Sequence, residues 1–70
     1  MHPIEELRHV HDAIATRERA RANELAALFP GDGSSDWTTY DEALTTFNIE
    51  RADELAELLR LASRVLGTRP

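Results

Sequence analysis

The sequence predicts an all-α protein, an antiparallel helical hairpin that assembles into a helical bundle. A cluster of turn-forming residues at positions 30–35 lies near the middle of the 70-residue chain, and no other Gly or Pro occurs between residues 4 and 66. The two flanking segments are rich in Ala, Leu, Glu and Arg, which are strong helix formers. We therefore expect two helical arms joined by one loop, within a single domain covering residues 1–70.

The first arm is expected to be one unbroken helix over residues 3–28. Pro3 suits the first turn of a helix, and the two glutamates after Ile4 complement the positive end of the helix dipole. Apolar residues recur at spacings of three and four before and after the charged run 16–19. A kink near Thr16 is the alternative, but Ala and Arg favour the unbroken form.

The second arm begins with the spacing of a capping box, in which Thr39 and Glu42 would each satisfy a backbone N–H. The apolar stripe keeps one helical phase along this arm, which favours a single helix over residues 40–66. Asn48 is a good N-cap residue, so a short helix to Phe47 followed by a longer one is the alternative. The sequence leaves both forms open.

The composition narrows the class of protein. A net charge of −5 disfavours attraction to nucleic-acid phosphates, and we expect no nucleic-acid partner. The absence of Cys excludes disulfides and thiolate metal sites. No apolar run reaches the roughly 20 residues that span a bilayer, and the N-terminal segment lacks the features of a secretory signal. We expect a cytoplasmic protein of a bacterium or phage, with no membrane association.

The C-terminal segment carries more apolar residues than one helix contact needs. They cover more than half of the helix circumference, whereas packing against one partner needs an arc of about 100°. We expect the surplus to contact another protein or a second copy, with a homodimer as the first choice. The predicted interface residues are Leu55, Leu58, Leu59, Ala62, Val65 and Leu66, together with Trp37 and Tyr40.

All four aromatic residues, Phe29, Trp37, Tyr40 and Phe47, lie near the predicted loop. Trp and Tyr are common in binding hot spots, which is the reason for including two of them in the interface. The first expectation for the aromatic residues is nevertheless a local cluster that closes the tip of the hairpin, with a binding hot spot as the alternative.

Two charged residues interrupt the apolar stripes, Glu18 on the first arm and Arg51 on the second. If the chain folds back around residues 33 and 34, residue i lies opposite a residue near 67 − i, so the two interruptions fall at one level. We expect either an ion pair between them, which would fix the register, or two side chains that extend to solvent.

Candidates for metal binding lack a complete ligand set. His9 and His11 lie about 200° apart around a helix and cannot share a metal ion within one chain, and His2 and His9 have no third ligand nearby. The loop 32–36 has oxygen ligands in alternation but Ala43 stands where a calcium loop has its bidentate Glu. We expect no metal and no cofactor.

Acidic residues on both arms have a spacing that resembles the motifs of all-α nucleotide pyrophosphohydrolases, which bind Mg²⁺ with carboxylates from neighbouring helices. The residues concerned are Glu5, Glu6, Glu50, Asp53 and Glu54. Those enzymes carry a third acid where this chain has His9, and hairpin geometry places Glu5 near Ala62 instead of Asp53. We therefore expect solvated helix charges and no enzymatic activity.

The most consistent function is a small non-enzymatic interaction module, such as a regulator, adaptor or accessory subunit. The alternative is an acidic inhibitor or antitoxin-like protein that mimics nucleic acid, because acidic residues gather on the second arm. A helix-turn-helix with its turn at Asn48 ranks lower, since its recognition helix would begin with Glu50 and repel phosphates. The basic cluster Arg17, Arg19 and Arg21 has acidic neighbours and does not change this order.

Overall fold

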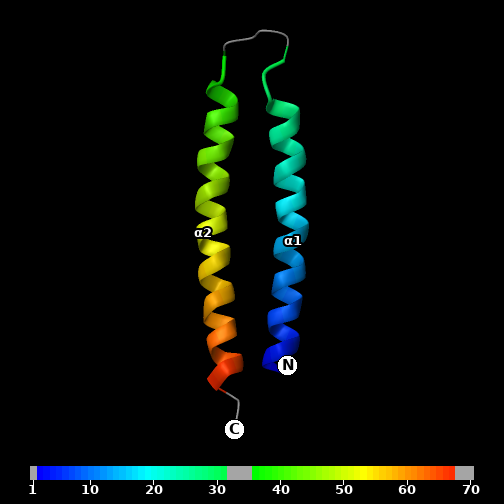
Figure 1. Ribbon diagram of the computed structural model, residues 1–70, viewed down its shortest axis with the longest axis vertical. Helices are drawn as coiled ribbons and strands as arrows, with labels where there is room; N and C mark the ends of the chain where they lie inside the picture. The colour runs from blue at the N-terminus through cyan, green and yellow to red at the C-terminus, as the bar shows by residue number, and fades with distance from the viewer. Residues whose placement is uncertain (1, 32–35, 68–70) are drawn as a thin grey trace.

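Two antiparallel helices make up the described part of the molecule (Figure 1). The computed structural model describes residues 2–31 and 36–67. Helix α1 spans Pro3–Leu28 and α2 spans Thr38–Gly67, and the two lie side by side in a rod of 58 × 16 × 14 Å. The predicted all-α hairpin is confirmed, and the described residues contain no strand.

Each helix begins with a side-chain cap on a backbone N–H. His2 Nδ1 accepts a hydrogen bond from the Ile4 N–H at 3.1 Å, in front of the proline at the first turn of α1. Asp36 Oδ1 accepts from the Thr38 N–H at 3.0 Å, and this hydrogen bond lowers the pKa of the Asp36 carboxyl. The predicted capping box is wrong, because α2 already begins at Thr38 and Thr39 lies inside its first turn.

Both helices are continuous. Helix α1 runs through the charged run 16–19, as predicted, and the Thr16 hydroxyl donates to the Asp12 carbonyl at 3.1 Å without breaking the helix. Helix α2 runs through Asn48, so of the two forms left open for this arm the single helix is the one found.

The core is thin and has a charged centre. Leu61, with 2% of its surface exposed, is the only buried apolar residue in the described part of the chain. The other two buried residues are Arg21 and Glu54. Half-buried apolar residues lie on both sides of this charged layer, Leu7, Val10, Ile14, Leu58 and Val65 toward the termini and Leu25, Leu28 and Phe47 toward the loop.

Three aromatic rings close the loop end of the hairpin. Phe29, Trp37 and Tyr40 contact one another edge to face, with ring centroids 5.1 to 5.8 Å apart. The predicted aromatic cluster is confirmed for these three residues, whereas Phe47 lies outside the ring contacts and lines a groove with Leu28. The calcium-like interpretation of the loop rests on residues 32–35, which lie outside the described residues.

The side-chain register differs from the expected one. Glu6 pairs with Arg64, where the 67 − i rule expects residue 61, and Glu18 pairs with Arg51, where it expects residue 49. Helical side chains lean toward the N-terminus of their own helix. In an antiparallel pair the side chains of the two helices therefore lean toward each other along the axis. A side chain on α1 then contacts a residue of α2 that comes later in the sequence than the residue whose backbone lies opposite.

Replacing Leu61 by Ala tests the thin core. Removing a fully buried leucine side chain costs about 2–5 kcal/mol, a large part of the stability of so small a domain. We expect Leu61→Ala to shift the urea midpoint strongly downward, measured by circular dichroism at fixed protein concentration. Ile49→Ala is the matched control, because Ile49 is 62% exposed and its replacement should change stability by less than about 0.5 kcal/mol. Equal shifts in the two variants would contradict the assignment of the core.

Candidate functional site

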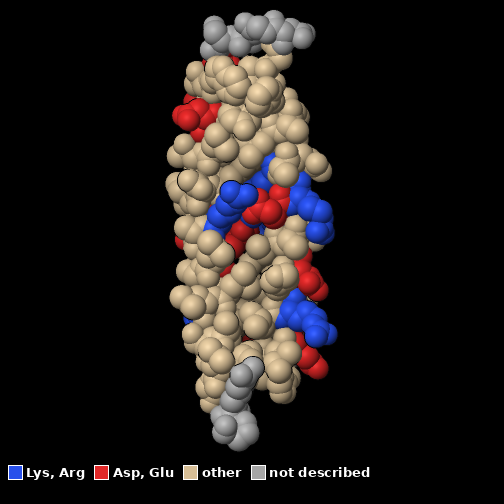
Figure 2. Space-filling view, in the orientation of Figure 1, with Lys and Arg blue, Asp and Glu red and all other residues tan. Residues whose placement is uncertain are grey.

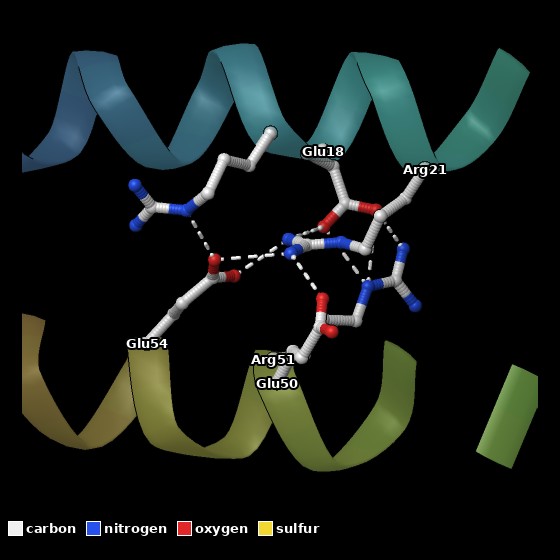
Figure 3. Close-up of polar contacts among 6 residues, drawn as sticks. Glu18, Arg21, Glu50, Arg51 and Glu54 are labelled. Carbon is white, nitrogen blue, oxygen red and sulfur yellow. Dashed lines mark hydrogen bonds and ion pairs between the residues drawn. The ribbon is translucent and has the colours of Figure 1, made fainter. Parts of the chain in front are cut away.

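A buried ion pair joins the helices at the middle of the hairpin. Arg21 on α1 and Glu54 on α2 are only 5% and 9% exposed. Two parallel hydrogen bonds connect them, Arg21 Nη1 to Glu54 Oε2 at 3.0 Å and Nη2 to Oε1 at 2.6 Å (Figure 3). This is the bidentate geometry in which a guanidinium matches a carboxylate, and a lysine in its place would lack it.

Further charged groups surround this pair. Arg21 also donates to Glu50 Oε1 at 3.3 Å and to Glu18 Oε2 at 3.1 Å. Glu54 Oε2 accepts a second hydrogen bond, from Arg17 Nε at 2.9 Å. Arg21 Nε is buried without a hydrogen-bond partner among the described residues, which costs free energy.

Of the two forms expected for Glu18 and Arg51, the ion pair is the one found. Arg51 Nε donates to both Glu18 oxygens, at 3.0 and 2.9 Å, and Arg51 Nη2 donates to Glu18 Oε1. This pair is partly exposed and extends the network to the surface (Figure 3). The whole set, called the charged network below, consists of Arg17, Glu18, Arg21, Glu50, Arg51 and Glu54. Its three arginines and three glutamates cancel in charge.

The network lowers the pKa values of its carboxyl groups. Hydrogen bonds from Arg51 and then from Arg21 lower the pKa of Glu18 to about 2. The hydrogen bond from Arg21 lowers the pKa of Glu54, against the opposing effect of burial, and Arg17 adds to it. The same contacts raise the pKa values of Arg21 and Arg51, so all four groups are charged at neutral pH.

In the sequence the members of this network belong to separate features. Arg17 and Arg21 belonged to a basic cluster, and Glu50 and Glu54 to an acidic motif. Each couple has a spacing of four residues, so each presents two like charges on one side of its helix. The sequence signal for the network is therefore the equal spacing of the two couples, which places two arginines of one arm opposite two glutamates of the other. Arg19, the remaining member of the basic cluster, is exposed and donates to the Thr16 hydroxyl at 3.2 Å.

The predicted interface residues of α2 divide into two groups. Leu58, Ala62 and Val65 are half-buried along the contact with α1. Leu55, Leu59 and Leu66 are 66%, 70% and 62% exposed. Of the aromatic pair, Trp37 is 44% exposed and Tyr40 is half-buried, and both belong to the ring cluster at the loop end. The hairpin contact therefore uses only part of the apolar surface of α2.

The exposed leucines follow a stripe along α2 that includes Arg51. Leu55 lies four residues after Arg51, and Leu59 and Leu66 follow at steps of four and seven, which keep to one side of a helix. Leu44 lies seven residues before Arg51 and is 41% exposed.

A second stripe along α1 includes Glu18. His11 and Ala15 precede Glu18 by seven and three residues, and Ile4 lies seven residues before His11. Ile4 is 49% exposed. Because Glu18 and Arg51 contact each other, the two stripes lie on the same side of the hairpin. We call this surface the apolar face; its members are Ile4, Ala15, Ala22, Leu44, Leu55, Leu59, Ala62 and Leu66, with the Glu18–Arg51 pair between them.

Two grooves between the helices run along the apolar face. The first, of about 420 Å³, is lined by Ile4, Leu7, Arg8, His11, Leu58 and Ala62. The second, of about 320 Å³, is lined by Ile14, Glu18, Arg51, Glu54 and Leu55. On the face of the molecule shown in Figure 2, charged side chains gather at mid-height and along the α1 edge. The surface above and below them on this face is mostly uncharged.

The described residues offer no assembled site for metal chemistry. No three His, Asp or Glu side chains among residues 2–31 and 36–67 converge as metal ligands. Glu50 and Glu54 are held by arginines, and the His2 imidazole caps α1. Neither helix in this part of the chain has an apolar stretch that would cross a bilayer.

A comparison of single and double replacements tests the buried pair. Glu54→Gln removes the bidentate partner of Arg21 and leaves it only the more exposed Glu18 and Glu50, which we expect to cost about 3 kcal/mol, the lower end of the range for a broken buried pair. Replacing both residues, as Arg21→Met with Glu54→Leu, should restore stability to near the wild-type value or above it. Urea unfolding at fixed protein concentration measures both. A double replacement as unstable as the single one would contradict a mainly electrostatic cost.

The lowered carboxyl pKa values predict acid sensitivity. A carboxyl whose pKa is lower in the folded than in the unfolded state stabilises the fold at any pH above the pKa of the unfolded state, here about 4.5. This contribution disappears as the pH falls toward the pKa of the folded state, which is about 2 for Glu18. We expect the urea midpoint, followed by circular dichroism, to fall between pH 4.5 and 2. The variant Glu18→Gln with Arg51→Gln should lose less over this interval, and an identical loss would contradict the assignment.

No protein-family model, curated protein or solved structure matches this chain. Its function is therefore inferred from the apolar face and the charged network alone.

Proposed function

We propose that the protein is a non-enzymatic protein–protein interaction module that binds a helical surface through its apolar face. The observation that carries this proposal is the exposure of Leu55, Leu59 and Leu66 on one side of α2, where more than 60% of each residue is open to solvent. Three large aliphatic residues in one stripe, with an apolar groove beside them, are typical of a surface that packs against another helix.

The thin core supports the same proposal. A two-helix hairpin with one buried leucine and a charged centre buries little apolar surface to offset the ordering of its backbone. Domains of this size commonly gain stability from disulfides, metals or association. The chain has no Cys, and a partner over the apolar face would bury the exposed leucines.

The two alternatives have weaker support. A nucleic-acid mimic would need a row of free acidic groups on α2, but three of the six acidic residues of this helix, Glu50, Glu54 and Glu57, are paired with arginines. A helix-turn-helix DNA binder would need a turn at Asn48, where α2 is continuous.

Site-specific photo-crosslinking in the protein's own host cell tests the proposal. A photoreactive phenylalanine analogue in place of Leu55 should give a discrete crosslinked product, because this position lies within the apolar face. The matched control carries the analogue in place of Ile49, which is similarly exposed but lies about 120° around the helix from Leu55. The expected result is a product from position 55 and much less from position 49.

Mass spectrometry of the product then identifies what occupies the face, whether this chain or another protein. Absence of any product at position 55, or equal labelling at both positions, would contradict an interaction role for the apolar face.

A further inference from the structure

We propose that the apolar face binds a second copy of this chain, and that the two copies are related by a two-fold axis parallel to the long axis of the hairpin. The result is a four-helix bundle in which α1 of each copy packs against α2 of the other, with both loops at the same end. This inference rests on the interaction role proposed above and names the occupant of that same face.

The size of the apolar face fits a dimer. One side of the rod, 58 Å long and 16 Å wide, has a projected area on the order of 900 Å², which is large enough to hold an interface of the roughly 800 Å² per partner that stable complexes bury. The face extends along both helices, from Ile4 and Leu66 near the termini to Leu44 toward the loop. A flat rod with apolar residues along its full length fits a partner of equal length, and a second copy has that length.

The two charges at the centre of the face are complementary under this axis. Glu18 and Arg51 lie at one level, Glu18 on α1 and Arg51 on α2. A two-fold axis along the rod leaves the position of every residue along the long axis unchanged, and it places α1 opposite the α2 of the second copy. Each Glu18 then faces Arg51 of the partner subunit, and the four groups form a neutral ring of alternating charge.

The opposite orientation lacks this match. If the second copy were turned end over end, α1 would face α1 and α2 would face α2. At mid-height Glu18 would face Glu18 of the partner subunit, and the arginines would likewise face each other, which is unfavourable when water is excluded. Charge complementarity therefore selects the arrangement with the loops together.

Side-chain size points the same way. Counted from the level of Glu18 and Arg51 toward the termini, the stripe on α1 reaches the small Ala15 after three residues and the stripe on α2 reaches the large Leu55 after four. Packing α1 against α2 of the second copy places large side chains opposite small ones, which fills an interface evenly. The end-over-end arrangement would instead bring Leu59 level with the partner's Leu44 and Ala15 level with the partner's Ala22, so that large side chains meet large ones and small ones meet small ones.

Light scattering coupled to size-exclusion chromatography gives the first test, on the purified full chain at micromolar concentration. We expect twice the chain mass of 7.9 kDa, and a thermal midpoint that rises with protein concentration. Leu55→Gln with Leu59→Gln should weaken the dimer at least tenfold, and Ile49→Gln should leave it unchanged. A monomer with a concentration-independent midpoint would overturn the dimer, whether or not the double variant folds.

Spin labelling then tests the orientation. The chain has no Cys, so Thr38→Cys gives one label per copy, at the loop end of the rod. With the loops together, the two labels should lie roughly one bundle width apart, about 20–30 Å given helix spacings of 8–10 Å and the label linkers. Asp53→Cys, near mid-height, is the control that should give a short distance in either orientation.

A Thr38 distance approaching the 58 Å length of the rod would overturn the proposed axis. The outcomes also separate this inference from the broader proposal. A monomer in solution whose position 55 crosslinks to a different protein in the cell would overturn the homodimer and leave the interaction role standing. A monomer without any crosslink would overturn both.

Discussion

The bidentate contact between Arg21 and Glu54 is the interaction on which the hairpin depends. It occupies the position where a larger helical domain would have its apolar centre, and the rest of the charged network surrounds it. A buried ion pair contributes little net stability, because desolvation offsets most of the attraction. Its main effect here is on specificity: a slip of one helix along the other would leave two buried charges without partners.

A small domain usually has apolar residues at its centre and charged residues on its surface. This hairpin has the reverse arrangement, with charge at its centre and apolar residues at its rim. The half-buried residues on either side of the network give the hairpin some apolar contact, yet Leu55, Leu59 and Leu66 face outward. This reversal is understandable if the hairpin is half of a larger core. The network then sets which level of α1 meets which level of α2, and a surface packed on the apolar face supplies most of the apolar burial.

The sequence predicted the two helices, their approximate ends and the ring cluster at the loop, because these depend on local propensity and on breaker residues. It also indicated the Glu18–Arg51 pair as one of two possible forms, since both residues interrupt an otherwise apolar stripe. It did not predict the burial of Arg21 and Glu54. Charged residues are by default assigned to solvent, and only the direction in which side chains lean along antiparallel helices brings these two together. For the same reason the expected partners of Glu6 and Glu18 were off by three and two residues, and that of Arg21 by eight.

The ring cluster gives the protein a built-in local probe. Trp37 is the only tryptophan, and it contacts Phe29 and Tyr40 at the end of the rod farthest from the termini. Its fluorescence therefore senses the opening of that tip, whereas the far-ultraviolet signal averages over the full length of both helices. If the melting curves from these two signals fail to superimpose, the rod frays from one end before the whole hairpin unfolds.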